Sequence, residues 1–364
     1  MSVLAYHDVE APPQRAARPE PVGPAPIDFR ALRKAISPFQ APSLKRSVWQ
    51  LVSTLGAYLA VNAAMYAALQ VSVWLTLALA PLATGFVIRL FIIQHDCGHG
   101  SFFKSKRANA LVGLLCSPFT FTPYAFWRRQ HNDHHTAFNN LDKRGSGLDI
   151  YSTCATVREY AALSPAKRLI YRVSRHPLVT QLILPPFIFL ILYRLPFDRP
   201  DAWKREGLGV LATNLMIAAA LGGLMLVFGV WPVLIVQLPI IALAAIVGTW
   251  LFCVQHRFEE AQWAAEDSWH PMDASLHGSS YLKLPPVLQW FTGNIGLHHV
   301  HHLDARVPNY RLQACHEAVA DLERVTTLTL KEALRAPSYS LWDEDRKQMT
   351  RVPSERSLRA AFGI

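Results

Sequence analysis

Charged residues are scarce in this 364-residue sequence: Asp, Glu, Lys and Arg make up 17% of it, whereas hydrophobic residues make up 51%. A soluble enzyme of this length would carry more charge, so the composition favours an integral membrane protein. Paired cysteines are also missing, because the five cysteines are scattered without CxxC spacing. We interpret them as reduced thiols that serve as small apolar residues.

The N-terminus lacks the apolar core that a signal peptide needs. Residues 8–28 are rich in Pro and Ala and predict a disordered cytoplasmic tail. The net charge is +10, but the basic residues do not gather with aromatic residues on one face, so we expect no nucleic-acid partner. They flank apolar runs instead, which is typical of cytoplasmic loops and favours attraction to anionic lipid or to an acidic redox partner.

Four uncharged or nearly uncharged stretches are long enough to cross a bilayer, at residues 48–68, 72–93, 209–230 and 233–253. Most basic residues lie outside them, and the positive-inside rule places those flanking segments in the cytoplasm. The sequence therefore predicts an all-α integral membrane protein, with four transmembrane helices in two hairpins, interfacial helices and a cytoplasmic histidine-rich cap. The predicted domain organisation is a membrane domain at 47–312 between cytoplasmic tails at 1–46 and 313–364.

Two further apolar runs, 109–126 and 178–195, contain prolines that interrupt helical hydrogen bonding. The second run has Pro185 and Pro186 near its centre. If this run crossed the membrane, the histidines before and after it would lie on opposite sides. We therefore interpret both runs as helices that lie along the interface or dip part-way into the membrane.

Histidines are concentrated in three short boxes and at one position after the fourth apolar stretch. The first box has two histidines one helical turn apart, and the other two boxes share the spacing i, i+3, i+4. All of them are expected close to the cytoplasmic interface, where their imidazoles can converge on a metal. The nine candidate ligands are His95, His99, His131, His134, His135, His256, His298, His301 and His302.

The number of imidazoles narrows the choice of metal. Imidazole suits Zn, Cu, Fe and Ni, but nine ligands overfill one structural zinc site, which takes four. We favour a di-iron centre that activates O2, with an open position on each ion. A di-zinc hydrolase is the alternative, although it would not need spans that deliver an apolar substrate. A metal or haem transporter is a further alternative. It would distribute its histidines across the depth of the membrane, whereas these histidines are expected at one interface.

Several neighbouring residues have candidate supporting roles. Asp96 and Asp133 could accept the second N–H of a ligand imidazole, and Asn294 could hold a metal-bound water, although each could equally be a capping or solvated residue. His299 lies off the shared face of its box and is expected to be an outer partner or exposed. The remaining histidines are treated as non-ligands: His7, His176, His270, His277 and His316. The aromatic residues that could line a substrate slot, or form an interfacial belt, are Phe102, Phe103, Trp127, Trp290 and Phe291.

The segments HDCGH, HNDHH and HHVHH resemble the three histidine boxes of the membrane fatty acid desaturase family. The resemblance extends through residues 141–152, 252–256 and 278–310, and covers about residues 48–312. Three residues separate the histidines of the first box. This spacing is similar to that of the acyl-lipid delta-12 (omega-6) and omega-3 desaturases, whereas the acyl-CoA delta-9 type usually has four.

The resemblance implies O2-dependent insertion of a double bond into the acyl chain of a membrane lipid, with two iron ions held by the nine candidate histidines. The family needs two electrons per turnover, and this sequence has no HPGG-type cytochrome b5 module, so a separate ferredoxin or cytochrome b5 donor is expected. The implied location is a bacterial inner membrane, with the metal site on its cytoplasmic face. The alternative is a di-iron membrane hydroxylase or ketolase that acts on an alkane, a carotenoid or a lipid.

Overall fold

The computed structural model of the protein describes residues 27–144, 153–196 and 204–362. Residues 1–26 of the predicted N-terminal tail, and residues 145–152 of the motif at 141–152, lie outside the described residues. The described chain is mostly helical, as predicted. It also forms two small sheets that the sequence analysis did not anticipate.

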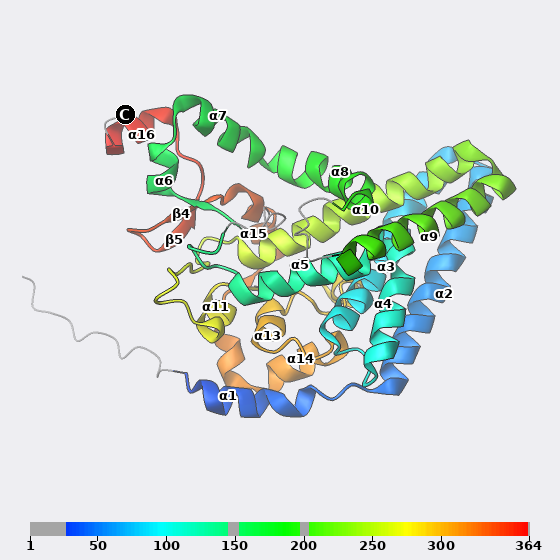
Figure 1. Ribbon diagram of the computed structural model, residues 1–364, viewed down its shortest axis with the longest axis horizontal. Helices are drawn as coiled ribbons and strands as arrows, with labels where there is room; N and C mark the ends of the chain where they lie inside the picture. The colour runs from blue at the N-terminus through cyan, green and yellow to red at the C-terminus, as the bar shows by residue number, and fades with distance from the viewer. Residues whose placement is uncertain (1–26, 145–152, 197–203, 363–364) are drawn as a thin grey trace, which may run out of the picture.

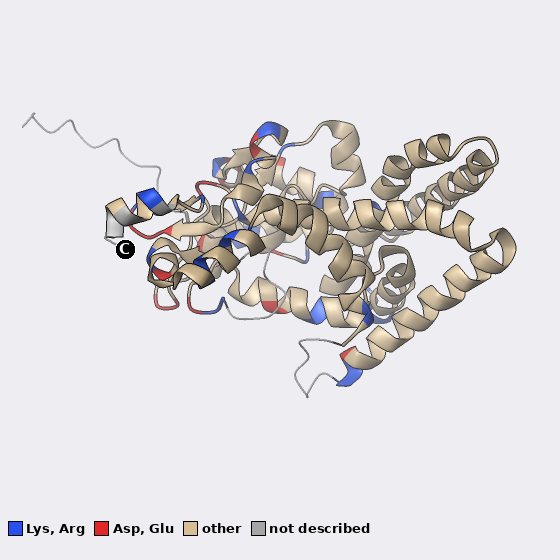
Figure 2. Cartoon of the chain, turned by 90° about the horizontal axis from the view of Figure 1, so that it is seen from above, with Lys and Arg blue, Asp and Glu red and all other residues tan. Residues whose placement is uncertain are grey.

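Four helices are long and apolar enough to cross a membrane, which confirms the predicted number of straight candidate spans. They are α2 (Leu44–Leu69), α3 (Val73–His99), α9 (Lys204–Phe228) and α10 (Val230–His256). Both α3 and α10 continue beyond the predicted apolar stretches and end on a histidine. Figure 2 shows Lys, Arg, Asp and Glu gathered toward the end of the molecule with the short elements, while the far ends of the long helices carry none.

Helix α3 is the centre of the helical bundle. One core cluster joins α2, α3 and α10, and includes Met65, Leu90 and Val236. Between α2 and α10, the Gln237 amide donates a hydrogen bond of 2.8 Å to Asn62, so the buried polar groups satisfy one another. The outer faces of the long helices expose large apolar side chains, as lipid-facing surfaces do.

The apolar run predicted at 109–126 forms parts of two helices with a sharp bend between them. Helices α4 (Lys106–Thr120) and α5 (Tyr124–Ala137) meet at 102°. Phe121, at the bend, has a left-handed backbone with φ of 53°. Gln94 of α3 supports the bend, because its side-chain amide donates to the Ser117 hydroxyl and to the Thr122 carbonyl at 3.1 Å each.

The second interrupted run is also bent. Helix α7 (Pro165–Ser174) meets the segment Val179–Arg194 at 47°. This segment consists of a π-helical turn η3 (Val179–Ile183), helix α8 (Leu184–Leu190) and a 3-10 turn η4 (Leu192–Arg194). The π-helical turn immediately precedes the two prolines, which cannot donate backbone hydrogen bonds. By length and composition each bent pair could count as a broken span, so the prediction that they lie along the interface stays a prediction.

The remaining elements form a cap at one end of the long helices (Figure 1). Its helical elements are α1 (Phe29–Ile36), η1 (Ser37–Phe39), α6 (Val157–Ala162), α11 (Pro271–His277), α12 (Pro286–Phe291), α13 (His298–Leu303), α14 (Asn309–Ala318), η5 (Ala320–Arg324), α15 (Leu330–Ala333), η6 (Ala336–Ser338) and α16 (Glu355–Phe362). Its strands are β1 (Ala155–Thr156), β2 (Tyr281–Leu282), β3 (Thr327–Leu328), β4 (Leu341–Asp343) and β5 (Gln348–Thr350).

The strands tie the C-terminal segment to the rest of the cap. Strand β1 pairs in parallel with β4, which pairs antiparallel with β5, while β2 pairs in parallel with β3. Arg257, directly after α10, is fully buried and donates a hydrogen bond of 2.6 Å to the Tyr339 carbonyl. Residues beyond 312 therefore pack against the end of α10, where His256 lies.

Candidate metal centre

The nine candidate ligands come together from four helices that are distant in the sequence. The last turns of α3 and α10 supply His95, His99 and His256, while α5 and α13 each supply three histidines. Helix α3 ends after His99 because Gly100 adopts a left-handed backbone with φ of 72° that a glycine tolerates without strain. The helix ends thus deliver the imidazoles to the junction between the long helices and the cap (Figure 1).

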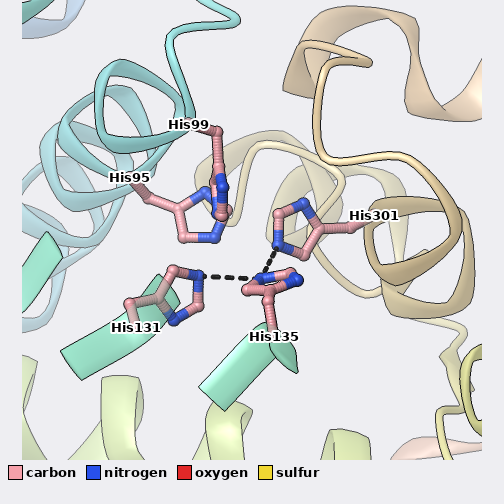
Figure 3. Close-up of side chains that lie close together, drawn as sticks. All are labelled: His95, His99, His131, His135 and His301. Carbon is pink, nitrogen blue, oxygen red and sulfur yellow. Dashed lines mark hydrogen bonds between the residues drawn. The ribbon is translucent and has the colours of Figure 1, made fainter. Parts of the chain in front are cut away.

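The first cluster, which we call the five-histidine group, brings all its candidate ligand atoms within 4.8 Å of one another. The Nε2 atoms of His131 and His135 lie 3.1 Å apart, and those of His135 and His301 lie 3.0 Å apart. Nitrogens that each lie about 2.1 Å from one ion are ~3 Å apart when adjacent, so this spacing fits a bound metal. Figure 3 shows the five rings facing a common centre: His95, His99, His131, His135 and His301.

The second cluster, the four-histidine group, consists of His134, His256, His298 and His302, all buried. The Nε2 atom of His298 lies 2.9 Å from those of His256 and His302. The Nε2 atom of His134 lies 3.1 Å from that of His256. This group also has the close nitrogen spacing that a shared cation requires.

Each histidine triplet is divided between the two groups. In α5, His131 and His135 belong to the five-histidine group and His134 to the other. In α13 the division is reversed, because His301 belongs to the five-histidine group while the other two belong to the four-histidine group. The imidazoles therefore converge, as predicted. They converge on two centres, and each triplet contributes to both.

Burial favours the neutral form of the three imidazoles of α13. Burial, and then repulsion between neighbouring rings, lowers the pKa of His298, His301 and His302 of α13 well below the usual value of 6.5. A neutral imidazole carries a lone pair that can bind a metal ion, whereas an imidazolium cannot. The chemistry of the donors therefore fits two metal ions that favour nitrogen ligands.

The three predicted supporting residues have different surroundings. Asp96 is buried, and its Oδ1 lies 3.2 Å from Nδ1 of His95, as its candidate role requires. Asp133 is 43% exposed and lies 3.8 Å from the Arg129 guanidinium. Asn294 donates a hydrogen bond of 3.2 Å to the backbone carbonyl of Asn309.

The other histidines lie outside both groups where the structure describes them. His299 is buried, not exposed, and its Nε2 lies 3.1 Å from Nδ1 of His316. His176 and His270 each accept a hydrogen bond from a nearby backbone N–H, and His277 is exposed at the end of α11. His7 lies outside the described residues.

A cavity of about 190 Å³ leads to both groups. Its walls are mostly apolar and come mainly from α3, α5, α8 and α10. Four histidines line it: His95, His131, His134 and, from α13, His298. Among the five predicted aromatic residues only Trp127 lines the cavity. Phe102 and Phe103 belong to the core beside α2, while Trp290 and Phe291 pack on Phe86. The aromatic residues that line it without having been predicted are Phe91, Phe189, Tyr193 and Phe252.

Helices of membrane-spanning length, two histidine groups and an apolar cavity are typical of membrane metalloenzymes that act on apolar substrates. Comparison with known proteins makes the assignment specific. The family model described as "Fatty acid desaturase" matches residues 72–328. The chain therefore belongs to the fatty acid desaturase family, which confirms the predicted resemblance. It is an oxidoreductase of this family, and the family acts on lipid acyl chains.

Several curated proteins are similar to this chain. A "Fatty acid desaturase" of Bacillus subtilis (strain 168) is 44% identical, over 88% of this chain and 89% of its own length. An "sn-1 oleoyl-lipid 12-desaturase" of Anabaena variabilis is 26% identical, over 70% of this chain and 72% of its own. A chloroplastic "Omega-6 fatty acid desaturase" of Spinacia oleracea is 26% identical, over 68% of this chain and 54% of its own.

Proposed function

We propose that the protein is an O2-dependent desaturase that inserts a second double bond, of the delta-12 (omega-6) type, into the acyl chain of a membrane lipid. The observation that carries the proposal is the placement of nine imidazoles, seven of them buried, in two groups beside an apolar cavity. The position of the new double bond is supported by the relatives named as 12- and omega-6 desaturases.

The proposed cofactor is a pair of iron ions, one in each histidine group. When bound, these ions supply the oxidising power that removes hydrogen from an unactivated methylene pair, for which acid–base side chains are too weak. The five-histidine group would hold one ion and the four-histidine group the other. Per turnover, two hydrogens leave the chain, and O2, two electrons and two protons complete the formation of two water molecules.

The protein's own part is to position the acyl chain and to exclude water. Apolar side chains such as Ile88, Phe91 and Phe252 line the cavity, and they would hold the acyl chain in one direction. His95 and His298 lie at the same cavity, so a methylene pair in it would lie beside both groups. A buried apolar site also keeps reactive oxygen chemistry away from bulk water.

The proposed setting is a bacterial inner membrane, with two helical hairpins and the histidine-bearing cap on the cytoplasmic face. The position of most Lys and Arg residues outside the four apolar stretches supports this orientation through the positive-inside rule. Electrons would come from a separate ferredoxin or cytochrome b5, and the excess of Lys and Arg over Asp and Glu in the chain suits an acidic donor.

Fatty acid analysis tests the proposed function directly. The full-length protein would be expressed in a bacterial host that lacks polyunsaturated fatty acids, and the fatty acids would be separated by gas chromatography. We expect new dienoic acyl chains, and none with the variant His301→Ala. Hydroxylated or ketone products in place of dienes would contradict desaturation and would favour the hydroxylase or ketolase alternative.

A further inference from the structure

The carboxylate of Asp96 is held between a candidate metal ligand and a helix of the cap. Its Oδ1 lies 3.2 Å from Nδ1 of His95. Its Oδ2 accepts two hydrogen bonds from Asn309, at 2.7 Å from the backbone N–H and at 2.8 Å from the side-chain amide. Asp96 and Asn309 are 3% and 1% exposed, so these bonds form away from water.

Asn309 is the first residue of α14, and the residue before it is Pro308, which offers no side-chain cap. The first backbone N–H groups of a helix have no partner within the helix, and its N-terminus favours a negative charge. Asp96 of α3 therefore takes the place of a capping residue. Among the described residues, no Lys or Arg lies within ion-pair distance of the Asp96 carboxylate. The basic side chain within that distance is His95.

The orientation of the Asn309 amide is fixed from the other side. Its Oδ1 accepts a hydrogen bond of 2.9 Å from the amide of Gln50, which is buried in α2. Because this oxygen faces a donor, the amide nitrogen of Asn309 must face the Asp96 carboxylate. A continuous chain of hydrogen bonds thus runs from α2 through α14 to the ligand-bearing turn of α3.

Other candidate ligands have different surroundings behind the ring. Behind the four-histidine group, Nδ1 of His256 lies 3.2 Å from the Gly278 carbonyl. The Nδ1 atoms of His298 and His302 are buried and have no hydrogen-bond partner among the described residues. A carboxylate behind a ligand imidazole fixes the tautomer that presents Nε2 to the metal and strengthens the ligand, more than a neutral carbonyl does.

We propose that Asn309 and Gln50 are positioning residues: they hold the Asp96 carboxylate against His95, and this strengthens metal binding by the five-histidine group. The inference rests on the proposed metal centre. It assigns a function to α2 and α14, neither of which carries a ligand. The anionic carboxylate also offsets part of the positive charge that metal binding adds to a site of neutral imidazoles.

Cobalt(II) provides a probe of this support that does not depend on activity. The full-length protein would be loaded with Co(II), and its visible absorption and its metal content would be followed during removal by a chelator. The phase of metal loss that is missing in His99→Ala belongs to the five-histidine group. In Asn309→Ala and Asp96→Asn this phase should accelerate by ~10–100-fold, the range for loss of an outer partner of a metal ligand. Gln50→Leu should accelerate it by less.

Asn62→Ala is the matched control, because it removes a buried amide of α2 that bonds to Gln237 and not to the histidine groups. It should leave both phases and the Co(II) spectrum unchanged. An unchanged rate of metal loss from the five-histidine group in Asn309→Ala and Gln50→Leu would overturn the inference, and so would equal acceleration in the Asn62 control. Failure of the proposed function is a separate result: an active wild type without iron would refute the di-iron proposal and leave the cobalt comparison valid.

Discussion

At the scale of single residues, helical geometry explains how one triplet of histidines can contribute to two metal sites. Residues i and i+4 are about 40° apart around a helix axis, whereas i+3 lies about 60° from i in the other direction. In α5, His131 and His135 therefore face one group while His134 faces the next. The HxxHH spacing suits two centres that lie side by side along the helix.

His256 is the ligand candidate that stands alone in the sequence, and its removal tests the four-histidine group. We predict that His256→Ala loses the metal of this group and lowers desaturation by at least ~100-fold, because even loss of an outer partner can cost that much. Metal analysis and product analysis of the purified protein check this. His277→Ala, at an exposed histidine outside both groups, is the control and should retain metal and activity. Full metal content in His256→Ala would contradict the assignment.

Gly248 of α10 lines the cavity, and its substitution tests whether the cavity holds the acyl chain. A Cβ at this position would meet Cδ1 of Ile88 at 3.7 Å, an ordinary contact, so Gly248→Ala should retain activity. Gly248→Phe should fill the cavity and lower activity by roughly 10-fold or more, with unchanged metal content, because loss of substrate positioning alone is that costly. A fully active Phe variant would show that the chain binds elsewhere.

At the scale of elements, α7 has its apolar side outward. Arg168 donates to the Ala161 carbonyl at 3.1 Å and Tyr171 donates to the Ser340 carbonyl at 2.6 Å, so the polar side faces the cap. Leu169, Ile170 and Val173 are 59%, 67% and 53% exposed. A helix on a water-facing surface has the opposite arrangement, and an apolar outer face is typical of a helix at the membrane interface.

We predict that this face of α7 contacts lipid. A nitroxide label on Ile170→Cys, in protein reconstituted in liposomes, should collide more often with O2 than with a water-soluble nickel complex. The native cysteines are buried, which favours selective labelling. The same label on Arg158→Cys, in α6, should show the reverse preference. Greater access of the nickel complex to position 170 would place α7 in water.

At the scale of the whole molecule, the charged residues of the described segments gather in the cap and at the ends of the helices nearest to it (Figure 2). This distribution supports the proposed topology, in which the junction between α9 and α10 faces away from the cytoplasm. We predict that alkaline phosphatase inserted after Gly229 is active in a bacterial host, because this enzyme matures outside the cytoplasm. Green fluorescent protein fused after Ile364 should fluoresce. The reverse pattern would contradict the proposed orientation of the cap.

The sequence was sufficient to predict the long helices and the nine clustered imidazoles. Membrane-spanning helices need long apolar runs, and the spacing of His298, His301 and His302 places them on one side of a helix whatever surrounds it. The sequence could not predict which group each imidazole joins, because this depends on how α5 and α13 are oriented toward each other. The contact of Asn309 with Asp96 joins residues 213 positions apart, and neither has a local pattern that reveals it.

The central claim is that two iron ions lie in two separate histidine groups. Anomalous X-ray scattering at the iron absorption edge, from crystals of active full-length protein, tests it most directly. The account predicts two peaks, one among His95, His99, His131, His135 and His301, and one among His134, His256, His298 and His302. A single iron peak, or peaks that appear only at the zinc edge, would contradict it.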